Sequence, residues 1–235
     1  MQTILILATG TDAGKTYTSR RLAEAIALRW GTVPVAAVKP IETGVTKDAL
    51  TDAALLAESS KPKLKPHHAY SFVPPISPHL ASRNSNTPIR INEITQWVRE
   101  HDSLQKPDGW IIVETAGGVF TPLSDGETNL DLALALEPSL WVLIAPDCLG
   151  VLHNVRSTLL AMERLARRPD VILLNAPETA DNSTGTNRAE LERLGWARIT
   201  GSVARNGGFN EADTEQLLLA LERFAASTPV PPRGR

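Results

Sequence analysis

The sequence has a single cysteine, Cys148, no long hydrophobic run and no block of like charges. One cysteine cannot form an internal disulfide, which suits a reducing compartment, so we expect the protein in the cytoplasm. No stretch approaches the roughly 20 apolar residues of a membrane span, and no leader-like segment opens the chain. The 24 Lys and Arg balance 26 Asp and Glu, giving a formal net charge of -2. Neither nucleic acid nor a membrane is therefore expected as a partner.

Apolar, β-branched runs alternate with segments of helical character along the chain. The runs cover 3–8, 33–38, 110–114, 140–145, 171–175 and 198–203, and the helical segments cover 15–29, 48–58, 92–99, 151–166, 188–194 and 210–224. Runs that are apolar on both faces are typical of parallel strands, and the alternation predicts crossover connections. We therefore expect an α/β fold with a doubly wound, mostly parallel sheet and helices on both faces.

The length of 235 residues and the hydrophobic content of 42% suit one domain. We expect residues 1–226 to form it. Residues 227–235 contain three prolines and a glycine, and we expect them to form a flexible tail.

A segment near the start has the composition of a phosphate-binding loop, and it reads Gly10-Thr11-Asp12-Ala13-Gly14-Lys15-Thr16. It lies between the first apolar run and the first helical segment, where the backbone amides of a helix N-terminus bind phosphate oxygens. In such a loop Lys15 would reach the terminal phosphates, and the Thr16 hydroxyl would bind Mg²⁺. The segment predicts nucleotide binding on a fold like that of the P-loop NTPases.

The spacing of this loop departs from the usual motif of Gly, four residues and Gly-Lys-Ser/Thr. Thr9 occupies the first glycine position, and three residues separate Gly10 from Gly14. A polar turn without a ligand is the alternative interpretation. The flanking strand and helix patterns favour the phosphate loop.

A lysine follows the second apolar run, in Lys39-Pro40-Ile41-Glu42-Thr43-Gly44. At the carboxyl end of a buried strand, Lys39 could neutralise charge on a transferring phosphoryl group. The alternative is a lysine that ends a strand in solvent. The Thr43 hydroxyl and the flexible Gly44 add possible donors beside the cation.

A carboxylate closes the third apolar run, in Glu114-Thr115-Ala116-Gly117-Gly118. Burying Glu114 there without a cation is costly, which makes it a candidate magnesium ligand. Gly117 and Gly118 would let the backbone approach a substrate, or they form only a tight turn. Asp52 could complete the magnesium site with Thr16, although it reads equally well as the cap or first turn of a helix.

Taken in order, these segments resemble the dethiobiotin synthetase family. The resemblance runs from about residue 3 to about residue 175 and includes Thr9–Thr16, Lys39–Gly44, Ser77-Pro78-His79, Glu114–Gly118 and Leu149-Gly150. It implies an ATP-dependent cyclo-ligase of biotin synthesis. The family forms the ureido ring of dethiobiotin from 7,8-diaminononanoate, CO₂ and ATP, through a carbamate and a carbamic-phosphoric anhydride.

The resemblance also implies roles for individual residues. Lys15 and Lys39 would be catalytic, and Thr16, Asp52 and Glu114 would bind Mg²⁺. The nucleotide would contact Gly10, Thr11, Asp12, Ala13, Gly14, Lys15, Thr16, Tyr17 and, at the adenine, Asn175. The substrate would contact Thr11, Lys39, Thr43, Gly117 and Gly118. Because the family is homodimeric, a neighbouring subunit would hold the carboxylate tail with Leu149, Gly150, Val151, Leu152 and Asn154, a segment that otherwise reads as an ordinary helix start.

Departures from the family pattern leave the choice of nucleotide open between ATP, CTP and GTP. Many members have a phosphate loop two residues longer, Thr115 stands where glycine is common, and Ala204 stands where a proline often follows the last strand. Ala176 replaces the aspartate that often follows Asn175.

Two other classes of nucleotide-binding protein fit the sequence less well. A partitioning or cell-division ATPase switch usually has a second lysine early in the loop, where Thr9 and Gly10 stand here. A GTP-binding switch would need an Asn-Lys-x-Asp motif, which is absent. A nucleotide-binding module without catalysis stays an alternative.

Overall fold

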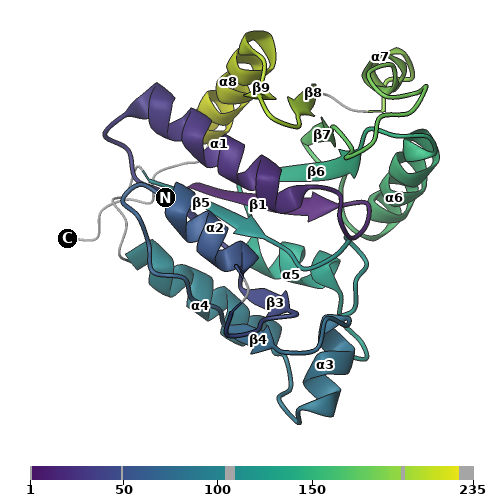
Figure 1. The fold of residues 1–235 in the computed structure, drawn as a ribbon. Helices are drawn as coiled ribbons and strands as arrows, with labels where there is room; N and C mark the ends of the chain where they lie inside the picture. Colours follow the sequence, from purple (N-terminus) through teal and green to yellow (C-terminus); the bar gives the residue numbers. More distant parts are fainter. Residues whose placement is uncertain (1, 49, 104–108, 197–198, 228–235) are drawn as a thin grey trace.

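The strands of the computed structural model form one large sheet and one small one (Figure 1). The structure describes residues 2–48, 50–103, 109–196 and 199–227. The strands are β1 (Gln2–Ala8), β2 (Val35–Val38), β3 (Ile41–Thr43), β4 (Tyr70–Phe72), β5 (Trp110–Glu114), β6 (Leu140–Pro146), β7 (Val171–Asn175), β8 (Ile199–Ala204) and β9 (Gly208–Phe209). The helices are α1 (Lys15–Trp30), α2 (Asp52–Ser59), α3 (Pro78–Asn84), α4 (Ile91–Ser103), α5 (Asn129–Leu136), α6 (Val151–Leu165), α7 (Asn187–Arg193) and α8 (Glu211–Ser227).

The large sheet has the order β2-β5-β1-β6-β7-β8-β9, and only β9 pairs antiparallel. Strands β3 and β4 pair in parallel as a separate sheet. The predicted doubly wound, mostly parallel sheet is confirmed. Among the described helices, none has the length and apolar content that crossing a bilayer requires.

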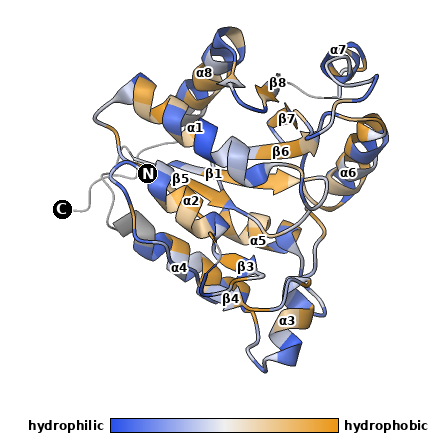
Figure 2. Ribbon diagram, viewed as in Figure 1, coloured by the Kyte–Doolittle hydropathy of each residue, from blue (hydrophilic) through white to orange (hydrophobic). Residues whose placement is uncertain are grey.

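The core consists of two layers, one on each face of the large sheet. In β1, Ile4 and Ile6 belong to one buried cluster, whereas Leu5 and Leu7 belong to the other. Successive side chains of a strand point to opposite faces, so a strand covered on both sides must be apolar throughout. Helices α1, α2 and α8 supply the first layer, and α3 to α7 supply the second. The central strands β1, β5, β6 and β7 are accordingly mostly hydrophobic (Figure 2).

The strand order reverses around β1, because the chain returns to one side of it with β5 and then crosses to the other side with β6. Ligands bind at such switch points, beyond the carboxyl ends of the strands. The loops meet there: the Val119 amide donates to the Ala8 carbonyl (2.9 Å), and the Thr9 amide donates to the Ile144 carbonyl (3.0 Å). The topology thus brings the two glycine-containing loops into direct contact.

Several short elements were not expected from the sequence. Strands β3, β4 and β9 have only two or three residues, which is too short for a periodic pattern. Helix α5 was missed, although Thr128 and Asp131 form a capping box at its start. Helix α2 begins at Asp52, four residues after the predicted start, where the Thr51 hydroxyl accepts the Ala54 amide (3.1 Å).

Helix α8 ends near the expected boundary between domain and tail. Helix α8 runs to Ser227, and residues 228–235 lie outside the described residues. The single domain and the flexible tail stay predictions.

Candidate active site

The loop between β1 and α1 has the strand, loop and helix arrangement that phosphate binding requires. Gly14 occupies the N-cap position of α1 with φ +84°, and the first turn of the helix contains no acidic residue. The positive end of the helix dipole is therefore free to attract an anion. A Cβ at Gly14 would lie 1.9 Å from Asn175 Nδ2, and one at Gly118 would lie 3.2 Å from the Gly10 Cα. Both positions need glycine for close packing, and Gly14 also needs it for its positive φ.

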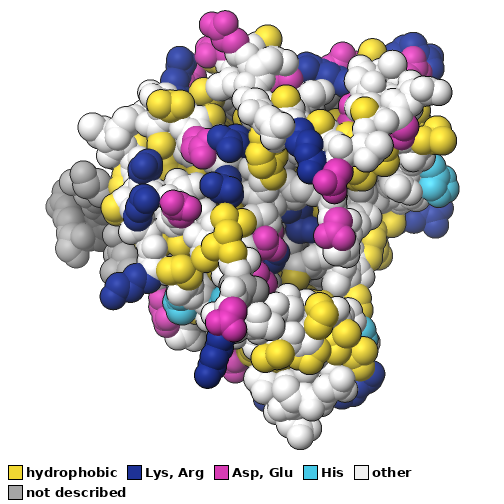
Figure 3. All heavy atoms as spheres, in the orientation of Figure 1, with side chains coloured by type: hydrophobic (Ala, Val, Ile, Leu, Met, Phe, Trp, Pro, Cys, Tyr) yellow, Lys and Arg dark blue, Asp and Glu magenta, His cyan; other side chains and the backbone are white. Residues whose placement is uncertain are grey.

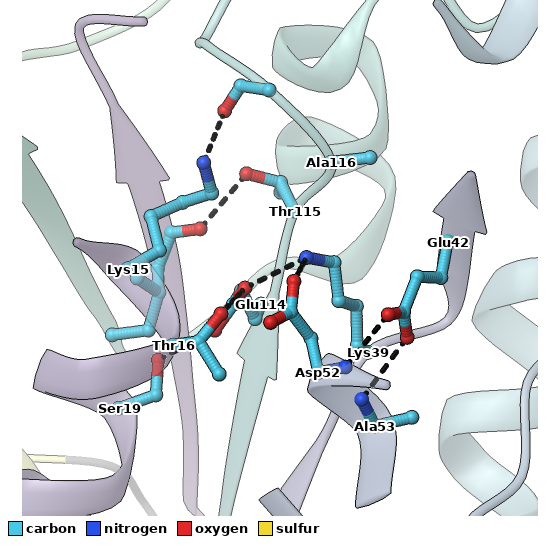
Figure 4. Close-up of polar contacts among 12 residues, drawn as sticks. Lys15, Thr16, Ser19, Lys39, Glu42, Asp52, Ala53, Glu114, Thr115 and Ala116 are labelled. Carbon is cyan, nitrogen blue, oxygen red and sulfur yellow. Dashed lines mark hydrogen bonds and ion pairs between the residues drawn. The ribbon is translucent and has the colours of Figure 1, made fainter. Parts of the chain in front are cut away.

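A buried cation and two carboxylates meet at the carboxyl ends of β2 and β5 (Figure 4). Lys39 directly follows β2 and is 7% exposed, while Glu114 closes β5 and is fully buried. The Lys39 Nζ lies 3.0 Å from Glu114 Oε1 and also contacts Asp52 Oδ2. Burial lowers the pKa of Lys39, but Glu114 and Asp52 together raise it above its ordinary value. The lysine is thus held as an ammonium ion, and the alternative of a strand end in solvent is wrong.

Two hydroxyl groups from α1 complete the surroundings of Glu114. Thr16 Oγ1 donates to Glu114 Oε1 (2.8 Å), and Ser19 Oγ donates to Glu114 Oε2 (3.0 Å). These residues are one helical turn apart and therefore share a face of α1. The buried carboxylate is satisfied by a cation and two hydrogen bonds, as a buried charge must be.

Lys15 lies at the same edge of the sheet and contacts the loop after β5. Its Nζ donates to the Gly117 carbonyl (2.8 Å). Burial lowers the pKa of Lys15 below its ordinary value, with Glu114 opposing and Lys39 reinforcing that effect. The two lysines that the sequence singled out therefore belong to one electrostatic cluster.

These residues line an open cleft of about 530 Å³, which lies in the range typical of small-molecule sites. It is lined by Thr11, Asp12, Ala13, Gly14, Lys15, Thr16, Tyr17, Lys39, Glu42, Thr43, Asp52, Pro75, Glu114, Ala116 and Gly117. Most of the residues predicted for phosphate, metal and substrate binding are thus brought together. On the face shown in Figure 3, positive and negative side chains are interspersed.

The residues present fit a magnesium ion. The Thr16 hydroxyl and the carboxylates of Asp52 and Glu114 are the hard oxygen donors that Mg²⁺ prefers. Glu114 contacts Thr16, and Glu114 and Asp52 both contact the Lys39 ammonium, so the donors already converge on a position that holds positive charge. Asp52 is also the first residue of α2, so its helical and its metal-binding interpretations are compatible.

The predicted residues that do not line this cleft are Gly10, Gly118, Asn175 and those at the start of α6. Asn175 ends β7 beside Gly14, and its Oδ1 is buried without a hydrogen-bond partner among the described residues. At the start of α6, the Leu149 amide donates to Asp181 Oδ2 (2.7 Å), and the Val151 amide donates to the Cys148 carbonyl (3.1 Å). The Asn154 amide donates to the Gly150 carbonyl (3.1 Å), so three amides of the predicted tail-binding segment are engaged within the chain.

The substitution of Thr115 for the usual glycine has a structural explanation. The Thr115 hydroxyl donates to the Ile6 carbonyl (2.9 Å), and the residue is buried. Ala204, which stands where a proline is common, also has a contact near the site: its carbonyl accepts the Tyr17 hydroxyl (2.8 Å). Tyr17 thereby joins α1 to the end of β8.

Sequence reasoning missed three residues that shape the site. Ser19 could have been found from its position one turn after Thr16, and Glu42 stands inside a motif already singled out. Asn129 gave no local signal, because its role depends on a contact across the fold: its Nδ2 donates to the carbonyls of Ala116 (2.6 Å) and Gly118 (2.8 Å).

Fold and site together define the class of protein: a P-loop nucleotide-binding protein, whose residues 2–212 match the AAA domain family. Two solved structures share the fold. A ParA family ATPase from Chlorobium tepidum aligns with a TM-score of 0.53 at 13% identity, covering 97% of this chain and 93% of that one. The MinC:MinD cell division complex of Aquifex aeolicus contains a chain that aligns with a TM-score of 0.54 at 12% identity, covering 100% of both chains. At such identities the likeness extends to the fold alone.

The relatives found by sequence identify the family, whereas the structural neighbours show only the fold. An ATP-dependent dethiobiotin synthetase BioD from Sulfurovum sp. is 35% identical over 72% of this chain and 78% of its own length. Enzymes of the same name from Anaeromyxobacter sp. (strain Fw109-5) and Corynebacterium diphtheriae are 34% and 30% identical, over 86% and 88% of this chain and 86% and 90% of their own lengths. The chain belongs to the family of ATP-dependent dethiobiotin synthetases. The resemblance recognised in the sequence is confirmed, and the partitioning-ATPase alternative is not favoured.

Proposed function

We propose that the protein forms the ureido ring of dethiobiotin from 7,8-diaminononanoate, CO₂ and ATP. One amine adds to CO₂ and loses a proton to give a carbamate. A carbamate oxygen then attacks the γ-phosphorus, and ADP leaves. The second amine attacks the carbonyl carbon of the resulting carbamic-phosphoric anhydride, and phosphate leaves as the ring closes and a proton is lost.

The observation that carries this proposal is the meeting of Lys15 and Lys39 at one edge of the sheet, in a member of this family. Phosphoryl transfer and ring closure need positioned charge more than covalent chemistry from the protein. The amides of the loop 10–14 bind the phosphates, Lys15 stabilises the transferred phosphoryl group, and Lys39 stabilises the carbamate. Thr11, Thr43 and Gly117 line the same cleft as the two lysines, and in this proposal they contact the substrate.

Magnesium is the proposed metal, held by Thr16, Asp52 and Glu114. Bound there, it would supply positive charge that neutralises the charge developing on the phosphate oxygens. Because Lys39 is paired with two of these three residues, its ammonium group is held beside the proposed metal position before any substrate arrives.

The remaining expectations belong to the same proposal. A homodimer would bring the α6 start, Leu149 to Asn154, to the carboxylate tail bound by the partner, and Asn175 would contact the base. A location in the cytoplasm stays a prediction from the sequence.

The test is incubation with the diamine, ¹³C-bicarbonate, magnesium and ATP, followed by mass spectrometry of the product. We expect dethiobiotin that carries one ¹³C, and no product with Lys39→Ala. Replacing ATP by CTP or GTP in the same assay determines the nucleotide preference. ATP binding with neither turnover nor labelled dethiobiotin would favour the alternative of a nucleotide-binding module without catalysis.

A further inference from the structure

Glu42 is a buried carboxylate at the edge of the cleft that the proposed chemistry does not use. It lies in β3 and is 7% exposed. Its Oε1 accepts the Asp52 amide (2.7 Å), and its Oε2 accepts the Ala53 amide (3.0 Å), as Figure 4 shows. His68 Nε2 lies 2.8 Å from the same Oε2.

Asp52 and Ala53 are the first two residues of α2, so Glu42 caps this helix from another element. The first amides of a helix have no partner within it, and a carboxylate there also interacts favourably with the helix dipole. The local cap, Thr51, accepts the Ala54 amide with its hydroxyl and the Leu55 amide with its carbonyl, and neither bond serves Asp52 or Ala53. The first two amides of α2 are therefore bound across the fold, by charge-assisted hydrogen bonds to β3.

This cap controls the position of Asp52. Residues 44–51 connect β3 to α2, and within the described part of this connection Lys47, Asp48 and Leu50 are exposed. The carboxylate of Asp52 contacts Lys39, and a single residue, Pro40, separates Lys39 from the start of β3. Glu42 ties the backbone of Asp52 to the same strand that follows Lys39, and so fixes both ends of the Lys39–Asp52 contact.

We propose that Glu42 is a positioning residue, whose carboxylate holds the start of α2 so that Asp52 is presented to Lys39 and to the magnesium ion. This inference rests on the proposed function only through the metal. Groups that orient metal ligands typically change metal affinity by about 10- to 100-fold when they are removed. A residue that merely stabilised α2 would change stability and leave metal affinity unaltered.

The test compares Glu42→Ala and Glu42→Gln with a matched control, Asp170→Asn. Asp170 is also a buried carboxylate that accepts a backbone amide, from Trp141 (2.9 Å), but it precedes β7 at the opposite end of the strands. Mn²⁺ is titrated into each protein with a non-hydrolysable ATP analogue, and bound Mn²⁺ is measured by electron paramagnetic resonance. Hydrogen exchange of a peptide covering residues 51–56 is measured separately, without metal or nucleotide.

We expect Glu42→Ala to weaken Mn²⁺ binding by about 10-fold or more and to speed exchange of the amides at 52 and 53. The Mn²⁺ affinity and exchange rate of Glu42→Gln should lie between those of Glu42→Ala and the wild type, because the glutamine Oε1 still accepts one amide. If Glu42→Ala does not fold, the Mn²⁺ affinity of Glu42→Gln alone tests the proposal. Asp170→Asn should stay within about twofold of the wild type. Mn²⁺ affinity within about twofold of the wild type in both Glu42 variants, or no Mn²⁺ binding by the wild type, would overturn the proposal. Neither measurement requires product, so failure of ring closure in the wild type overturns the proposed function instead.

Discussion

Replacing Lys39 by methionine tests whether the cation supports the buried carboxylate. Lys39→Met keeps the buried stem of the side chain and removes its ammonium group. Glu114, whose side chain is fully buried, then loses its cation. Removing one partner of a buried ion pair typically costs about 3–5 kcal/mol. The hydroxyls of Thr16 and Ser19 still donate to Glu114, so the lower end, about 3 kcal/mol, applies here.

Asp52, the second partner of Lys39, adds little to this loss of stability. The Asp52 side chain is 39% exposed and returns to water, and pairs of that kind contribute about 0–1 kcal/mol. We therefore expect the urea midpoint of unfolding to fall by about 1 M, for a denaturant slope of about 3 kcal/mol per M. Circular dichroism or tryptophan fluorescence measures it.

The double variant Lys39→Met/Glu114→Gln distinguishes the pair from the separate side chains. With both charges removed, the loss of stability should be smaller than the sum of the two single losses, by about 1–3 kcal/mol. Lys39→Met and the double variant should both lack ring-closing activity, because the ammonium group of Lys39 is absent from each. Single losses that add to within about 0.5 kcal/mol would refute the claim that the two residues form a coupled buried pair.

Three further variants address other parts of the site. Burial raises the pKa of Glu42, but hydrogen bonds from His68 and from the α2 amides lower it below its reference value of 4.5. Above about pH 4.5 the ionised carboxylate stabilises the folded state, and this stability is lost as the pH falls through the lower pKa of the folded protein. The difference in melting temperature between the wild type and Glu42→Gln should therefore shrink on acidification. A difference that stays constant with pH would contradict this. Asn129→Ala removes two buried hydrogen bonds to the loop after β5, so we expect about 2 kcal/mol less stability in urea and a larger rise in KM for the diamine than for ATP; equal rises would show that the loop does not serve the substrate. Asn175→Ala should bring the kcat/KM values for ATP, CTP and GTP closer together in steady-state assays, and unchanged ratios would remove Asn175 from base recognition.

The sheet could be predicted from the sequence because its strands are buried on both faces. Runs such as 110–114 and 140–145 are apolar at every position, and this pattern predicts a central parallel strand without knowledge of its neighbours. Parallel strands end at the same edge of a sheet, so Lys39 and Glu114, far apart in the chain, could both be predicted at that edge. The structure adds that β2 and β5 are neighbours and that the two side chains therefore meet.

Contacts that depend on packing between distant short elements could not be predicted. Strand β3 has three residues, and its role in capping α2 through Glu42 follows from tertiary structure alone. The clamp that Asn129 forms on the loop after β5 likewise spans a loop and a helix start. The local signals, a capping threonine and a short apolar run, are too common to identify either contact.

The central claim is that the carbamate and the terminal phosphate react with each other between Lys15 and Lys39. Supplying C¹⁸O₂ in unlabelled water, and quenching before the label exchanges with solvent, tests this through the released phosphate. The account predicts that phosphate formed together with dethiobiotin contains one ¹⁸O, because the attacking carbamate oxygen leaves with the phosphoryl group. Dethiobiotin accompanied only by unlabelled phosphate would contradict it.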